Sequence, residues 1–250
     1  MNFPMPIIRG VIARRLLINF RVDPEVVARL LPLPFRPRLV RGRALAGVCL
    51  IRLEQLRPRG VAGVFGIASE NAAHRIAVEW DGETGPCQGV FIPRRDTNSL
   101  LNQLAGGRLF PGVHHLADFR IFECPTRIKL DLRSRDGITR LRVAARIAGE
   151  LSEHSVFASL EEASAFFQDG ALGWSPSVRE NEFDGLELRT FEWHMQPLAV
   201  ERIESSYFAD ARRFPNGSVE FDSALLMRGL EHEWIARGKM RAGESALCAT

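Results

Sequence analysis

The chain has 250 residues and a mass of 28.0 kDa, which is enough for one large domain or two small ones around a substantial core. Its hydrophobic content of 46% and charged content of 25% are ordinary for a globular protein, and a net charge of +3 gives no electrostatic case for nucleic-acid binding. Lys129 and Lys239 are the only lysines. Chemistry that needs a lysine amine therefore has two candidates.

Arginines interrupt the apolar residues near the start of the chain, at positions 9, 14 and 15. This pattern predicts neither a signal peptide nor a membrane span. The cysteines lie far apart, without a C-x-x-C motif or close Cys/His spacing: Cys49, Cys87, Cys124 and Cys248. We therefore expect reduced, packed thiols, no zinc module, no membrane association and a cytoplasmic location.

The first quarter of the chain predicts strands and one short helix. Residues 7–22 are rich in branched apolar side chains and predict a strand. Asp23 then provides a helix N-cap, Pro24 suits the first helical position, and residues 30–34 end the helix. Further strands are expected over residues 44–56, 74–80 and 89–92.

The middle of the chain predicts a capped helix and a hairpin. Asp96 and Thr97 are expected to cap a helix that the glycines after residue 105 terminate. Residues 127–133 then alternate strictly between polar and apolar, and residues 138–147 alternate back. Because Asp136 and Gly137 between them favour a tight turn, these segments predict a β-hairpin with one apolar face.

The last third predicts one more helix and several strands. Ser159 and Glu162 fit a capping box for a helix that ends at Gly170. Strands are expected over residues 186–193 and 199–208, a turn at residues 215–217, and a flexible tail over residues 236–250. No repeat, linker or low-complexity segment divides the chain, so we expect a single domain over residues 1–250. Many strands and few short helices predict an α+β fold around an antiparallel sheet or barrel.

Two adjacent histidines are the most informative candidates for chemistry. His114 and His115 precede a strand-like run, and the commonest nucleotide, metalloprotease and hydrolase motifs do not occur. Adjacent strand residues point to opposite faces, so we expect no metal site at this pair. An imidazole can act as an acid or a base near neutral pH. The alternative is that one histidine lies in a surface loop and the other is a core residue.

The chain resembles the acetoacetate decarboxylase-like superfamily and, within it, an uncharacterised bacterial branch. The resemblance rests on segments in a shared order along most of the chain: residues 19–25, 30–35, 68–71, 107–108 leading to 114–115, 191–198, 203–210, 221–228 and 232–234. It implies a curved antiparallel sheet that closes into a cone or barrel around a small apolar cavity, with a few short peripheral helices. Because members often form dimers that build larger assemblies, we expect a homodimer or a larger homo-oligomer.

The resemblance also implies which residues line the cavity. In the decarboxylases, two consecutive lysines follow a Gly-Arg pair, and the first forms an imine with the substrate; here that position holds His115 or its neighbour His114. A pocket carboxylate is retained as Glu70, and the arginine that holds the substrate carboxylate corresponds to Arg14 or Arg15. Imidazole cannot form the Schiff base, so imine-based decarboxylation is not expected.

Three hypotheses for function follow. The first is an enzyme that acts on a small keto acid, enol or related carboxylate through His/Glu acid–base chemistry, without a cofactor. The second is a non-catalytic barrel that keeps the cavity and binds a small ligand. The third is a structural role through oligomerisation. Enzymatic action predicts that His115 and Glu70 share one enclosed cavity, with Arg14 or Arg15 at its edge.

Overall fold

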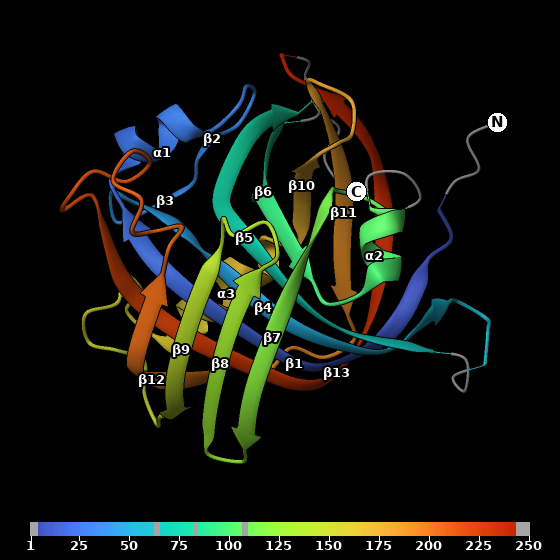
Figure 1. Cartoon of the computed structure of the whole chain (residues 1–250). Helices are drawn as coiled ribbons and strands as arrows, with labels where there is room; N and C mark the ends of the chain where they lie inside the picture. Colours follow the sequence, from blue (N-terminus) through green and yellow to red (C-terminus); the bar gives the residue numbers. More distant parts are fainter. Residues whose placement is uncertain (1–4, 63–65, 83–84, 107–109, 244–250) are drawn as a thin grey trace.

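One sheet of thirteen strands organises the residues that this computed structural model describes, 5–62, 66–82, 85–106 and 110–243 (Figure 1). The strands are β1 (Ile8–Val22), β2 (Arg36–Pro37), β3 (Leu39–Val40), β4 (Arg43–Pro58), β5 (Ile67–Gly82), β6 (Gly85–Thr97), β7 (His114–Cys124), β8 (Arg127–Ser134), β9 (Arg140–Ile147), β10 (Leu172–Pro176), β11 (Glu182–Thr190), β12 (Gln196–Ser205) and β13 (Val219–Arg241). Three short helices accompany them within the same residues: α1 (Pro24–Leu30), α2 (Leu100–Ala105) and α3 (Leu160–Asp169). The predicted fold class, a curved sheet with a few short helices, is confirmed.

The strand pairings make the sheet ring-like. Strands β6, β7, β8, β9, β12, β13, β1, β4 and β5 are neighbours in that order, and β5 pairs with β6 again. Figure 1 shows β7, β8, β9 and β12 side by side along one part of the ring. The long strand β13 pairs with β12 and β1 and, in its last part, with β11. The pairings are antiparallel except those that join β6 to β7 and to β10.

Strand β1 lies between β4 and β13 and is buried on both faces. Leu16 and Ile18 belong to one hydrophobic core, whereas Ile12 and Leu17 belong to a second. This double burial explains why the consecutive residues 16–18 are all apolar, although arginines interrupt the strand elsewhere. Helix α3 covers the second core with Phe166 and Phe167.

The predicted hairpin is confirmed, with a longer connection than a two-residue turn. Strands β8 and β9 pair antiparallel from Arg127 opposite Arg146 to Arg133 opposite Arg140. Ser134 N donates to Thr139 O, which leaves four residues in the loop, and Gly137 adopts a φ of +74° there. A positive φ favours glycine, so this residue fixes the turn.

Other local predictions differ in detail from the structure. Strand β6 continues through Thr97, so Ser99 caps α2, by accepting from Asn102 N. Ser159 caps α3 as expected, but Glu162 accepts from Ala158 N, not from Ser159.

The expected tail and the expected free thiols need correction. Residues 236–241 are part of β13, because they pair with β11, and residues 244–250 lie outside the described part of the chain. Cys49 and Cys124 are free thiols, but Cys87 is disulfide-bonded, and Cys248 lies outside the described residues. Within the residues described, no helix has both the length and the apolar character needed to cross a membrane.

Candidate active site

The parallel pairing of β6 with β7 places the histidine pair. Arg95 lies opposite His114, and Asp96 lies opposite His115. Because neighbouring strand residues point to opposite faces, the two imidazoles face different sides of the sheet. The antiparallel pairing of β5 with β6 places Arg95 opposite Ala73 on its other side. His114 and Arg95 therefore share one face, and His115 lies on the other.

A cavity of about 110 Å³ lies on the face that carries His114 and Arg95. A single water needs about 10–15 Å³, so the cavity has room for a small organic molecule. Its walls are mainly apolar, with Ile51, Leu186 and Trp234 among them. The polar side chains are few and come from β1, β4, β5, β6, α2 and β7: Arg15, Cys49, Asn71, Arg75, Arg95, Asp96, Asn102 and His114. A mostly apolar cavity with a few convergent polar groups is typical of a ligand site.

Three of these polar side chains are arginines that form no ion pair with any described residue. Among the ion pairs within the described residues, none involves Arg15, Arg75 or Arg95, and Asp96 is bonded to Arg94 at 2.7 Å. Burial lowers the pKa of Arg95 to about 10, and burial together with the nearby Arg15 charge lowers that of Arg75 to about 10. Buried charges are ordinarily paired. The cavity is therefore electropositive and suited to a small anion.

Hydrogen bonds to uncharged side chains and contacts with aromatic rings hold these arginines in place. Arg75 Nη2 donates to Asn19 Oδ1 at 2.5 Å, and Arg95 Nε donates to Ser175 Oγ at 2.9 Å. The Arg15 guanidinium lies over the Trp193 ring, at 5.6 Å from its centroid. The Nε atoms of Arg15 and Arg75 have no hydrogen-bond partner in the described structure. These contacts orient the charges without adding an ion pair among the described residues, and Asp184 acts on Arg95 only from beyond contact distance.

His114 is a neutral imidazole within this electropositive cavity. Burial and, to a smaller extent, the Arg95 charge lower its pKa to about 3. Its Nδ1 lies 2.9 Å from Gly112 O. A carbonyl oxygen can only accept, so Nδ1 carries the proton and Nε2 keeps its lone pair. His114 can thus accept a proton at Nε2. An anion beside Arg95 would raise the pKa of this imidazole by offsetting that charge.

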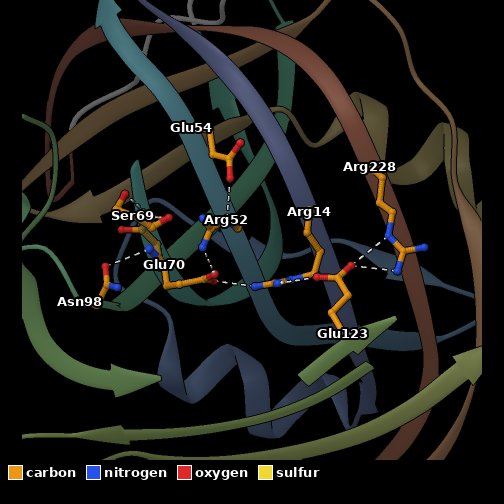
Figure 2. A network of polar contacts seen from close by, with 9 residues as sticks. Arg14, Arg52, Glu54, Ser69, Glu70, Asn98, Glu123 and Arg228 are labelled. Atoms are coloured by element: carbon orange, nitrogen blue, oxygen red, sulfur yellow. Dashed lines mark hydrogen bonds and ion pairs between the residues drawn. The ribbon is translucent and has the colours of Figure 1, made fainter. Parts of the chain in front are cut away.

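Glu70 belongs to a separate chain of alternating charges (Figure 2). Its carboxylate accepts from Arg14 Nη2 at 2.6 Å and from Arg52 Nη1 at 3.2 Å. Arg14 also donates to Glu123 at 2.8 Å, and Glu123 accepts from Arg228 at 2.9 Å. The Glu70 and Arg14 side chains are only 6% and 3% exposed. Every charge in this network therefore has an opposite charge beside it, and its centre, Glu70 with Arg14, is buried.

His115 lies in another polar group, near the hairpin loop. Its Nδ1 is 3.5 Å from Asp136 Oδ2, and its side chain is 42% exposed. Asp136 also accepts from Arg94 at 2.8 Å. Burial opposes the charged carboxylate, but hydrogen bonds from Ser134 and from Ile138 N, together with Arg94, lower the pKa of Asp136 to about 2. Asp136 therefore stays ionised beside His115.

The structure brings together only part of the predicted site. His114 and Arg15 line the cavity, whereas Glu70, His115 and Arg14 do not. No hydrogen bond or ion pair within the described residues joins Glu70 to either histidine. The expected cavity shared by His115 and Glu70 is thus not observed, because each is bound to other charged groups. Their catalytic roles stay predictions.

Sequence reasoning did not identify Arg75 and Arg95 as site residues. Each lies within a strand whose neighbouring residues are largely buried. An arginine inside such a strand is a usable signal, since arginine is rarely buried without a partner. The signal was not decisive, because the chain has 33 arginines and lysines in all.

Both lysines lie away from the cavity. Lys129 is exposed on β8, and Lys239 on β13 bonds Glu182 at 3.2 Å. Neither lines the cavity. Within the part of the chain that the structure describes, no group of three or more histidine, cysteine or acidic side chains is arranged to hold a metal ion.

Solved structures with the same fold are acetoacetate decarboxylases and related enzymes. An acetoacetate decarboxylase-like enzyme from Sphingomonas wittichii RW1 has 13% identity and a TM-score of 0.57, over 96% of this chain and 93% of that chain. Acetoacetate decarboxylase from Legionella pneumophila has 13% identity and a TM-score of 0.59, over 96% and 90%. The enduracididine biosynthesis enzyme MppR, complexed with pyruvate, has 11% identity and a TM-score of 0.59, over 98% and 93%. These likenesses confirm the expected acetoacetate decarboxylase-like fold.

A search of curated proteins found no match. A family model does match, over residues 12–213, and its description is an uncharacterized conserved protein, DUF2071. The match spans most of the strands that form the cavity and the network around Glu70, but not β13, which carries Trp234 and Arg228. The chain therefore belongs to the DUF2071 family.

Proposed function

We propose that this protein is an enzyme that binds a small keto acid, or a related carboxylate, in the cavity and moves a proton on it without forming a Schiff base. The observation that carries the proposal is a mainly apolar cavity lined by three arginines that form no ion pair in the described part of the chain, Arg15, Arg75 and Arg95. A carboxylate there would accept charge-assisted hydrogen bonds from these guanidinium groups. The pyruvate complex of MppR, a protein of the same fold, agrees with this ligand class.

In the proposed reaction, His114 accepts a proton from the carbon next to the ligand carbonyl. Its Nε2 is the unprotonated nitrogen, and Arg95 lies opposite it on the neighbouring strand. A ligand carboxylate at Arg95 would offset the charge that lowers the pKa of His114 and so make the imidazole a stronger base. The bound anion would thereby activate the group that reacts with it.

Exchange of carbon-bound protons for deuterium tests this step. In deuterated water, the wild-type protein is expected to accelerate exchange at the carbon next to the carbonyl of pyruvate or 2-oxobutyrate, measured by proton NMR. His114→Gln is expected to lower the exchange rate by about 10²-fold or more, since general base catalysis contributes about 10²–10⁴-fold. His115→Gln, which alters the neighbouring imidazole outside the cavity, is the matched control and is expected to retain the rate. Loss of exchange in His115→Gln alone would contradict the role of His114.

No covalent imine is expected with acetoacetate or pyruvate. Lys129 and Lys239 are the only lysines and neither lines the cavity, and imidazole does not form a Schiff base with a ketone. Intact mass measured after borohydride reduction in the presence of either ketone should equal that of the untreated protein. A stable adduct on a lysine would show that the chemistry occurs elsewhere.

A non-catalytic binding protein is the second candidate. It is favoured by one observation, that Glu70 bonds Arg14 and Arg52 and leaves His114 without a partner carboxylate in the cavity. In this case the protein would bind the carboxylate, and the deuterium exchange rate would equal that of the buffer. A cytoplasmic location and a homodimeric or larger assembly remain part of the proposal for either function.

A further inference from the structure

A second, smaller cavity adjoins the main one. Its volume is about 20 Å³, and Arg15 and Arg75 line both cavities. Arg38 is the only other charged side chain among the residues that line the small cavity, and Phe166 and Phe167 of α3 form much of the rest. Arg15 and Arg75 therefore contribute to the walls of both spaces.

Aromatic rings position the arginines of the small cavity. The Arg38 guanidinium lies over Phe166 at 4.1 Å from the ring centroid, and that of Arg75 lies over Phe167 at 4.7 Å. Arg38 Nη2 is 3.6 Å from Asp169, whose side chain is 53% exposed. This distance is longer than a normal hydrogen bond. Arg38 thus has a weak, solvent-exposed partner, and Arg15 and Arg75 have no ion pair within the described residues.

The charges exceed what one carboxylate can compensate. Three guanidinium groups line the main cavity, and the small cavity adds a fourth, Arg38. A ligand with one carboxylate beside Arg95 would leave Arg15 and Arg75 uncompensated. Buried charge without a counter-charge is unfavourable, so a second anionic group at these arginines would be stabilised strongly.

We propose that the ligand is a small diacid. One carboxylate binds at Arg95 in the main cavity, and the second binds between Arg15, Arg38 and Arg75, with one of its oxygens in the small cavity. The volume of about 20 Å³ exceeds only slightly the space that one water needs, so it suits a single carboxylate oxygen and not the bulkier phosphate group. This inference rests on the proposed function and specifies its substrate class.

Pairs of ligands that differ only in one charge test the inference. Calorimetric titration of the wild-type protein compares succinate with succinamate, and glutarate with glutaramate, because each amide keeps the shape and loses one negative charge. At least one diacid is expected to bind at least ~10-fold more tightly than its monoamide. The phosphonate 3-phosphonopropionate is expected to bind more weakly than succinate. Tighter binding of the phosphonate would overturn the assignment of a second carboxylate.

A variant of Arg38 tests where the second carboxylate of the ligand binds. Arg38→Met is expected to reduce diacid affinity to that of the monoamide and to leave monoamide affinity unchanged, because Arg38 does not line the main cavity. Arg38→Lys, which keeps the charge, is expected to retain part of the difference in affinity between the diacid and the monoamide. Equal binding of diacid and monoamide by the wild type would overturn this inference and leave the proposed function standing. Binding of no acid at all would overturn both.

Discussion

The free energy of unfolding is expected to fall steeply as the pH drops below about 6.5, because three buried histidines are neutral in the folded protein. Burial lowers the pKa of His74 and of His114 to about 3 and that of His232 to about 4, from 6.5. The unfolded chain therefore takes up protons first, and stability is complete above pH 6.5 and is lost between that pH and about 3. Each histidine contributes a slope of about 1.4 kcal/mol per pH unit within this window.

His74 is the most suitable of the three histidines for substitution in this test. Both of its ring nitrogens are buried without a hydrogen-bond partner in the described structure, and its ring packs on Tyr207 at 4.4 Å between centroids. His74→Phe is expected to reduce the pH slope by about 1.4 kcal/mol per unit, measured by urea unfolding between pH 4 and 7. The matched control is His154→Phe, since the His154 side chain is 79% exposed. An unchanged slope in His74→Phe would show that His74 does not contribute to the acid sensitivity.

Replacing Glu70 with alanine is expected to lower the free energy of unfolding by about 3–5 kcal/mol. The change removes the carboxylate between Arg14 and Arg52 and leaves the Arg14 guanidinium buried, with Glu123 as its remaining partner. Breaking a buried ion pair from one side costs much more than removing an exposed pair, because the remaining charge stays desolvated.

Glu54→Ala is the matched control for Glu70→Ala. Glu54 bonds Arg52 at the exposed end of the same network, with 38% of its side chain exposed. Its loss is expected to change the free energy of unfolding by at most about 1 kcal/mol. Chemical denaturation measures both variants. If Glu70→Ala were as stable as Glu54→Ala but unable to catalyse proton exchange, Glu70 would have the catalytic role that the sequence predicts.

The parts of the fold that depend on local sequence could be predicted. The alternation on both sides of Asp136 and Gly137 specifies the hairpin of β8 and β9, because its signals lie within about twenty residues. Ser159 likewise marks the start of α3, since an N-cap acts on the first turn that follows it. The ring-like closure joins strands far apart in the chain, and only the family resemblance indicated it.

The site could be predicted only in part, because its geometry depends on distant pairings. His114 rather than His115 faces the cavity, and the register between β6 and β7 decides this. That register follows from packing that no local pattern reveals. The pairing of Glu70 with Arg14 spans 56 positions. The same residue types occur throughout this arginine-rich chain, so charge alone did not indicate which arginines lack partners.

Calorimetric titration of pyruvate against its neutral analogue pyruvamide tests the central claim most directly, that unpaired arginines make the cavity a carboxylate site. The wild-type protein is expected to bind pyruvate saturably and pyruvamide at least ~10-fold more weakly. Arg95→Met, which removes the charge beside His114, is expected to bind neither while remaining folded by circular dichroism. Equal affinities for pyruvate and pyruvamide, or unchanged pyruvate binding by Arg95→Met, would contradict the account.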